Sequence, residues 1–396
     1  DLLHGFEERL VPELYPTDFS WTPSWGEERM SSNNTATGVT RSGIVKRTVQ
    51  VDHDEAVFYH AKNKLHQFAR EDSAPFFLNA SFIHPHEPYC TLQEYWDLYR
   101  HENIALPNTP LQPESERELH TTRMLHHAML VDTGISEEHV RIARHAYLGN
   151  VSYFDEMVGG LMKTLEQTGL LANTVVVISA DHGDMLGEHG LWYKKHFFED
   201  CIRVPLIIHW PERFSAGRHS QPASLIDLLP TLCDLAEIVP DEVAPEPLDG
   251  SSLLGACEGQ MRDEDTPVFA EITSEGVPSP MFMVRKGKHK LMSGGGAPSV
   301  LYDLERDPHE LINLAHDATH HEILDELERL VRRQWDSERL NEQVLVSQRQ
   351  RRLVHAAHEV GKTPAWEHQS QDLADYWIHR DSEGYNDWAW KGISEV

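Results

Sequence analysis

The sequence predicts an α/β fold with a large mixed, mostly parallel sheet between helices, followed by a smaller C-terminal α+β subdomain and an extended tail. Strands and helices alternate through the first part of the 396 residues, as they do when helices cover both faces of a parallel sheet. After about residue 265 the pattern changes to short strands, and from about Glu342 the sequence is polar and rich in tryptophan.

The first fifty residues contain many turn formers and aromatic side chains. Tyr15-Pro16 and Trp21-Thr22-Pro23 favour an extended backbone, because a residue before proline is biased away from the helical region. We therefore expect an extended surface segment over 1–50. The apolar run from Phe76 to Phe82 then leads into His84-Pro85-His86-Glu87-Pro88, which predicts a strand followed by a histidine-rich loop.

The middle of the chain has the clearest periodicity. Apolar residues recur every three or four positions from Ser136 to Gly169, which predicts an amphipathic helix capped by its first serine. The β-branched run from Thr174 to Ala180 predicts a strand buried on both faces of a parallel sheet, with Asp181-His182-Gly183 at its carboxyl end. Pro205 to His209 predicts another strand, and Ser224 to Ala236 another helix.

The C-terminal third predicts a separate α+β unit. Short strands are expected over Val268–Ile272, Met281–Arg285 and Leu301–Leu304, and a helix over Glu322–Trp335. We predict a main domain over 1–262, a subdomain over 263–340 and a tail over 341–396. The tryptophans of the tail predict docking on a surface or on a neighbouring subunit, hence a homo-oligomer.

Composition excludes some classes of function. The formal charge of −29 repels nucleic acid and anionic membranes, and no apolar run is long enough to span a bilayer. Four scattered cysteines without a CxxC pair favour free thiols and a cytoplasmic location. The chain starts without an initiator methionine or a signal-peptide pattern, so we expect that a segment precedes Asp1.

The strongest chemical signal is the stretch DHGDMLGEHG over 181–190. A carboxylate and an imidazole at a strand end, followed by glycines, are the residue types that build metal sites. A polar turn with capping acids is the alternative. Two other candidates are Lys194, in an aromatic-flanked basic pair with Lys195, and the two histidines around Pro85. A lysine there could meet an anionic oxygen, and a histidine could protonate a leaving group, but surface and structural roles remain open.

Four landmarks follow one another in the order typical of one enzyme family. They are FLNASFIHPHEPY over 77–89, AYLGNVSYFD over 146–155, DHGDMLGEHGLWYK over 181–194 with Arg203-Val204-Pro205, and LYDL over 301–304 with Asp307-Pro308 and Asn313-Leu314. Together they resemble the sulfatase family. Within that family, LHGFEERL over 3–10 and YPTDFSWTP over 15–23 are most similar to choline sulfatases.

The resemblance implies an alkaline-phosphatase-like fold, with 1–262 as the catalytic domain. It also implies hydrolysis of a sulfate ester with a divalent cation, normally Ca²⁺, and a formylglycine made from cysteine. By position, Asp181 and His182 match metal ligands, whereas Lys194 and His86 match the lysine and histidine of the sulfate pocket. Trp21 and Glu271 match residues that hold the trimethylammonium group of choline; ring faces and negative charge are suited to such a cation. A loop anchor and a strand-end acid are the structural alternatives for these two.

The sequence departs from the family pattern in two ways. The nucleophile motif Cys-x-Pro-x-Arg and the first metal-binding aspartate pair are expected upstream of Asp1, and none of Cys90, Cys201, Cys233 or Cys257 is followed by that proline and arginine. In addition, a His-Asn pair of choline sulfatases aligns with Ser32-Asn33-Asn34-Thr35.

We therefore predict hydrolysis of a small alkyl sulfate, with choline sulfate as the expected substrate. The alternatives are a phosphonate monoester or phosphodiester hydrolase of the same superfamily, and a non-catalytic protein that binds quaternary ammonium.

Overall fold

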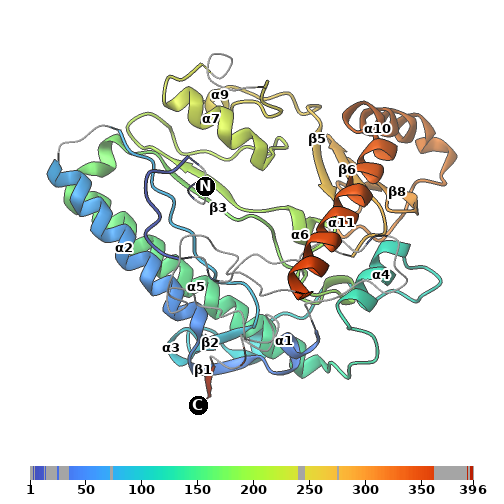
Figure 1. Ribbon diagram of the computed structural model, residues 1–396, viewed down its shortest axis with the longest axis horizontal. Helices are drawn as coiled ribbons and strands as arrows, with labels where there is room; N and C mark the ends of the chain where they lie inside the picture. Colours follow the sequence, from blue (N-terminus) through green and yellow to red (C-terminus); the bar gives the residue numbers. More distant parts are fainter. Residues whose placement is uncertain are drawn as a thin grey trace.

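The computed structural model describes residues 3, 5–12, 14, 25, 35–71, 75–239, 246–273, 276–360, 390 and 393–395. Trp21 and most of the predicted tail lie outside these residues. Among the described helices, none combines the length and the apolar character needed to cross a membrane. The described strands include a two-stranded sheet and a four-stranded C-terminal sheet. In Figure 1 a long pair of helices, the two-stranded sheet and the C-terminal sheet follow one another across the molecule.

The long pair consists of α2 (Val49–Glu71) and α5 (Glu137–Thr168), which lie side by side (Figure 1). The Ser136 hydroxyl accepts the backbone N–H of His139 at 3.2 Å and forms a capping box, which satisfies free donors at the helix start. Gly169 ends α5 in the left-handed conformation, at φ 77°. The helix predicted from Ser136 to Gly169 is thus confirmed with its caps.

The segment around β1 (Gly43–Arg47) corrects the expectation for the first fifty residues. β1 pairs in parallel with β2 (Cys90–Leu92) and antiparallel with β9 (Ser394–Glu395), and α1 (Thr37–Thr40) precedes it. Within the part of the chain that the structure describes, regular structure therefore begins at Thr37. The turn-rich composition of the segment hid this short strand, whose partners lie far away in the sequence.

The segment from Phe76 to Phe82, predicted as a strand, is extended but is not part of a sheet. Its residues alternate between exposed and half-buried, which is the period of an extended chain. The apolar pattern therefore indicated the backbone conformation correctly. The prediction of a strand is wrong because no other described strand pairs with this segment.

The central sheet contains β3 (Val176–Ser179) and β4 (Leu206–His209), so both predicted strands form. The two strands pair antiparallel, with Ile178 opposite Ile207. β3 is half-buried, and Ile207 is 53% exposed. The parallel, fully buried surroundings predicted for Thr174–Ala180 are therefore not found among the described strands, although β3 still delivers Asp181 at its carboxyl end.

The C-terminal sheet consists of four antiparallel strands in sequence order. They are β5 (Val268–Ile272), β6 (Met281–Lys286), β7 (His289–Gly294) and β8 (Ala297–Asp303). Three of them were predicted. β7 was missed because its sequence, HKLMSG, is largely polar. The predicted helix over 322–335 is confirmed as α10 (His321–Gln334), and α11 (Ser337–Val360) follows it.

The C-terminal sheet is buried on both faces, and its side chains alternate between them. Phe282 and Val284 pack in a core with Leu327 of α10, whereas Met281 and Met283 belong to the core that contains Tyr89 and residues 191–193 and 197–198. The sheet therefore packs directly against the loops after β3. The domain boundaries at 262 and 340 remain predictions.

Shorter helices connect these layers. They are α3 (Gln93–Trp96), α4 (Leu119–His127), α6 (Glu199–Ile202), α7 (Leu228–Leu235) and α9 (Leu254–Cys257). A 3₁₀ turn over Leu225–Asp227 leads into α7, so the helix predicted over Ser224–Ala236 is confirmed.

The described parts of the tail dock on the same chain. Gln348 of α11 exchanges two hydrogen bonds with the backbone of Trp25, at 2.9 and 3.0 Å. The guanidinium of Arg41 lies 4.1 Å from the centre of the Trp390 ring, and β9 adds to β1. Docking on a surface therefore describes these tail residues, whereas the homo-oligomer remains a prediction.

Candidate active site

The loop that follows β3 presents Asp181 and His182 side by side. The backbone N–H of His182 donates to Asp181 Oδ1 at 2.9 Å, and Asp181 Oδ2 lies 3.6 Å from His182 Nε2. His182 Nδ1 lies 2.8 Å from the carbonyl oxygen of Gly183 and donates to it, so the lone pair is on Nε2.

These two residues fit one side of a metal site. A carboxylate and a neutral imidazole with its lone pair on the same side are suitable ligands for a divalent cation, and a backbone carbonyl fixes the ring orientation as in known metal sites. Within the described residues, no group of three or more His, Cys, Asp or Glu side chains forms a complete metal site. The structure thus contains a pair of candidate ligands.

Close backbone packing fixes the conformation of this loop. Gly183 N donates to the carbonyl oxygen of Cys201 at 2.7 Å, and a Cβ at Gly183 would lie 2.1 Å from the carbonyl oxygen of Asp200. Only glycine fits there. Further along the loop, the buried carboxylate of Glu188 accepts the backbone N–H and the hydroxyl of Thr109, at 2.8 and 2.6 Å.

Asp184 is a partly buried carboxyl group two residues after His182. It accepts the Tyr89 hydroxyl at 2.8 Å and the backbone N–H groups of Leu186 and Tyr193 at 3.0 and 3.2 Å. Burial, with the nearby negative charge of Glu87, raises the pKa of Asp184 to about 7. This carboxyl group therefore links the loop after β3 to the segment around Tyr89.

His84 and His86 face different surroundings. A turn at His84 and Pro85 ends the extended segment, and the Nδ1 of buried His84 lies 2.7 Å from Asp54 Oδ2. His86 instead faces Lys194, with 2.6 Å between its Nε2 and the Lys194 Nζ. Of the two histidines around Pro85, only His86 therefore faces Lys194, because the chain turns between them.

Glu87 determines the tautomer of His86. His86 Nδ1 lies 2.9 Å from the Glu87 carbonyl oxygen and 3.0 Å from its Oε2, so Nδ1 carries the hydrogen. Nε2 is then the acceptor for the Lys194 ammonium group. Burial lowers the pKa of His86 to about 4, opposed by the Glu87 carboxylate and assisted by Lys194. His86 is therefore neutral at neutral pH.

The structure distinguishes Lys194 from Lys195. Lys194 faces His86, whereas Lys195 Nζ lies 3.4 Å from His127 Nε2 on the other side of the loop. Tyr193 and Lys195 both have positive φ, at 68° and 80°, which is uncommon for residues other than glycine. This backbone turns the two lysines to opposite sides.

Four predicted site residues come together. The rings of His86 and His182 lie 6.0 Å apart, centre to centre, so Lys194, His86, His182 and Asp181 form a continuous group. Glu271 is exposed on β5, and no hydrogen bond or ion pair described in the structure connects it to this group. Trp21 lies outside the described residues.

Prediction from the sequence missed Glu87, Asp184 and Tyr89. All three lie inside motifs that were recognised, next to residues that were chosen. Each is a charged or hydroxyl group inside a motif, and it becomes informative only when its burial and partners are known.

The cysteines do not fit the nucleophile of the family. Cys90 and Cys201 are buried, and burial raises their thiol pKa values to about 12 and about 11. Cys233 and Cys257 lie on α7 and α9, and neither stands in a Cys-x-Pro-x-Arg motif. None of these four cysteines therefore fits the precursor of the family's formylglycine.

Residues 16–238 match the family model of the sulfatases, and residues 187–336 match that of the N-sulphoglucosamine sulphohydrolase C-terminal region. The chain therefore belongs to the sulfatase family, a class of sulfuric ester hydrolases. It is 39% identical over 379 residues to the choline-sulfatase of Rhizobium meliloti (strain 1021). This match covers 93% of this chain and 73% of that protein.

Two further comparisons extend this result. The arylsulfatase of Clostridium perfringens (strain 13 / Type A) is 30% identical over 66% of this chain and 54% of its own length. The chain thus spans about half of that relative. The crystal structure of a phosphonate monoester hydrolase of Agrobacterium radiobacter matches with a TM-score of 0.61 and 23% identity, over 82% of this chain and 66% of that one. The predicted alkaline-phosphatase-like fold is thereby confirmed.

Proposed function

We propose that this protein hydrolyses a small alkyl sulfate ester, and that choline sulfate is its substrate. The observation that carries the proposal is the 2.6 Å contact between Lys194 Nζ and His86 Nε2, beside the Asp181–His182 pair. The similarity to a choline-sulfatase over 93% of the chain supports the choice of ester.

In this proposal Lys194 and His86 act on the sulfate group. The Lys194 ammonium group donates to a sulfuryl oxygen and stabilises the negative charge that develops as the ester S–O bond breaks. His86 is neutral and aligned by Glu87, so Nε2 can share a proton with Lys194. The leaving alcohol oxygen takes its proton from this pair, and the Glu87 carboxylate stabilises the imidazole when it is charged. Water balances the hydrolysis: its oxygen forms the new S–O bond as the ester bond breaks, and one of its protons returns to the pair.

The proposed cofactor is a divalent cation, Ca²⁺ by family resemblance. Asp181 and His182 would hold it, because one offers a carboxylate and the other an imidazole lone pair. When bound, such a cation supplies positive charge next to the sulfuryl oxygens. Dialysis against a chelator, followed by addition of Ca²⁺ or Mg²⁺ with sulfate binding as a second readout, tests this part.

The proposed selectivity for choline rests on Glu271 and Trp21. A quaternary ammonium group donates no hydrogen bonds, so negative charge and ring faces are the means of recognising it. Glu271 is an exposed carboxylate on β5 and can meet a cation at low desolvation cost. This assignment depends on the family match of each residue.

The deciding experiment is an assay of sulfate release. Protein expressed from the complete open reading frame is incubated with choline sulfate, ethyl sulfate and a phosphonate monoester, and inorganic sulfate and phosphonate are measured. Faster turnover of choline sulfate supports the proposal. Preferential turnover of the phosphonate would favour the phosphonate hydrolase alternative. Binding of choline without turnover would favour a non-catalytic role.

A further inference from the structure

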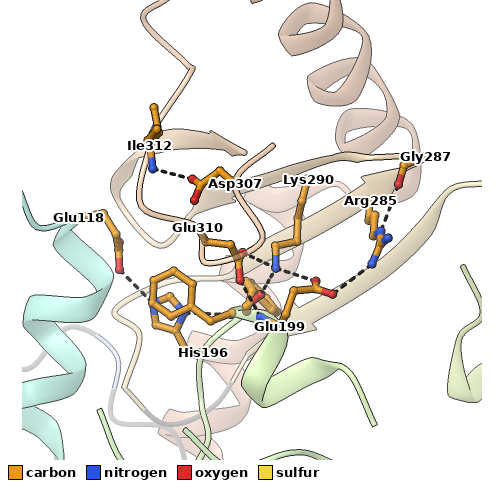
Figure 2. A network of polar contacts seen from close by, with 11 residues as sticks. Glu118, His196, Glu199, Arg285, Gly287, Lys290, Asp307, Glu310 and Ile312 are labelled. Carbon is orange, nitrogen blue, oxygen red and sulfur yellow. Dashed lines mark hydrogen bonds and ion pairs between the residues drawn. The ribbon is translucent and has the colours of Figure 1, made fainter. Parts of the chain in front are cut away.

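A buried group of charges connects the C-terminal sheet to the segment after Lys194 (Figure 2). The Lys290 side chain, on β7, is completely buried, and its ammonium group donates to the Phe197 carbonyl oxygen at 2.7 Å and to Glu199 Oε1 at 2.9 Å. Its third partner is Glu310, with which it forms an ion pair. The ammonium group thus contacts one carbonyl oxygen and two carboxylates.

Glu310 fixes the same segment from a second direction. Its Oε2 accepts the backbone N–H of Glu199 at 2.7 Å, while its Oε1 pairs with Lys290. Glu310 lies in a loop whose shape depends on Asp307, which accepts the backbone N–H of Ile312 at 2.7 Å (Figure 2). The Asp307-Pro308 motif thus has a structural role, because its loop presents the buried carboxylate of Glu310 to residues 197–199.

The segment that Lys290 and Glu310 contact, residues 197–199, begins three residues after Lys194. The backbone around Lys194 needs support from other parts of the chain. Positive φ values at Tyr193 and Lys195 persist only where the surroundings determine them. Contacts at 193 and 195 come from the N-terminal side: the Tyr193 hydroxyl donates to the Thr35 carbonyl at 2.5 Å, and His120 Nε2 donates to the Lys195 carbonyl at 2.9 Å. Lys290 and Glu310 supply the support downstream.

We propose that Lys290 and Glu310 are positioning residues that hold the 197–199 segment and thereby aim Lys194 at the sulfate ester. This inference rests on the proposed function of Lys194. It gives the C-terminal sheet a role in the reaction, because a side chain of β7 determines where a lysine outside that sheet lies. In this role both residues act through Lys194.

The test is a double-mutant cycle on the full protein. Lys290→Met removes the ammonium group but keeps most of the side-chain length, and kcat/KM for choline sulfate should fall about 100-fold, as expected for a misplaced catalytic group. In a Lys194→Ala background the same change should cost less than about 3-fold, because the residue acts through Lys194. Equal losses in both backgrounds would overturn the inference.

A matched control uses the neighbouring strand. Lys286→Met removes the half-exposed pair between Lys286 Nζ, at the end of β6, and Glu326 Oε1 of α10, which lie 2.6 Å apart. It should change kcat/KM by less than about 2-fold, since exposed ion pairs contribute little. If Lys290→Met does not fold, Glu310→Gln replaces it in the cycle, with an expected loss of about 10-fold.

Calorimetry with inorganic sulfate separates this inference from the proposed function. If the wild-type protein does not turn over any sulfate ester, the proposed function fails. In that case the double-mutant cycle uses the dissociation constant of inorganic sulfate in place of kcat/KM. A non-additive loss at Lys290 and Lys194 still supports positioning, whereas additive losses or no sulfate binding would overturn it.

Discussion

Lys194 Nζ lies 2.6 Å from His86 Nε2, although 108 positions separate the two residues in the sequence. His86 reaches this place because the chain turns after Ile83, and Lys194 reaches it because both flanking residues adopt positive φ. The pair joins the two motifs most responsible for the family resemblance. It is therefore the first target for mutation.

The neighbouring lysines should differ sharply in their effect on catalysis. Lys194→Ala is expected to lower kcat/KM for choline sulfate by about 10²- to 10³-fold, since it removes a donor aimed at developing charge. Lys195→Ala should cost less than about 5-fold, because that side chain contacts His127 instead. Steady-state kinetics with the two variants decide the matter, and comparable losses would show that the loop is oriented differently.

Gly183→Ala should disrupt the loop that carries Asp181 and His182. The added methyl group would lie 2.1 Å from the Asp200 carbonyl oxygen, so backbone must move. We expect a loss of more than about 2 kcal/mol in the free energy of unfolding. Gly217→Ala is the control, because a Cβ there meets no atom within 4 Å. Urea unfolding of both variants gives the comparison, and an unchanged midpoint for Gly183→Ala would contradict the packing.

Buried His120 should make the protein sensitive to acid. Burial, followed by the charge of His196, lowers the pKa of His120 from 6.5 to about 3. As pH falls below 6.5 the unfolded chain binds the proton before the folded one, so stability is lost, and the loss levels off near pH 3.

His120→Gln keeps a donor in position for the Lys195 carbonyl but does not titrate. From pH 7 to 4.5 the wild type should lose about 2 kcal/mol more than this variant. Unfolding by urea at several pH values measures the difference. Parallel loss in both proteins would show that His120 is not the group responsible.

Local pattern predicted helices and most strands well, because the information lies in neighbouring residues. The capping serine and terminal glycine of α5 are both present at the predicted ends. By contrast, the partner of β3 depends on which other strand is available, and Val and Ile residues suit either direction of pairing. β7 was missed because its buried Lys290 looks like a surface residue until Glu199 and Glu310 are known to surround it.

The candidate site likewise divides into residues that sequence motifs identify and features that depend on three-dimensional contacts. Family motifs identified Asp181, His182, Lys194 and His86, and the structure places these four together. Residue chemistry alone left the choice between Lys194 and Lys195 open, and the family position selected Lys194; the structure adds that Lys194 faces His86 and that Lys195 faces His127. The role of Glu87 required the distance to His86 Nδ1, which a sequence does not contain.

Recognition of the cationic part of the substrate can be tested at Glu271. This carboxylate is exposed on β5, so its attraction for a trimethylammonium group is weakened by water and salt. Glu271→Gln should therefore raise KM for choline sulfate by only about 3- to 10-fold, with little change in kcat. Ethyl sulfate, which has no cationic group, serves as the control substrate, and its KM should not change. A rise in KM for both esters would mean that Glu271 supports the fold of the site, and no rise for either would remove it from the choline site.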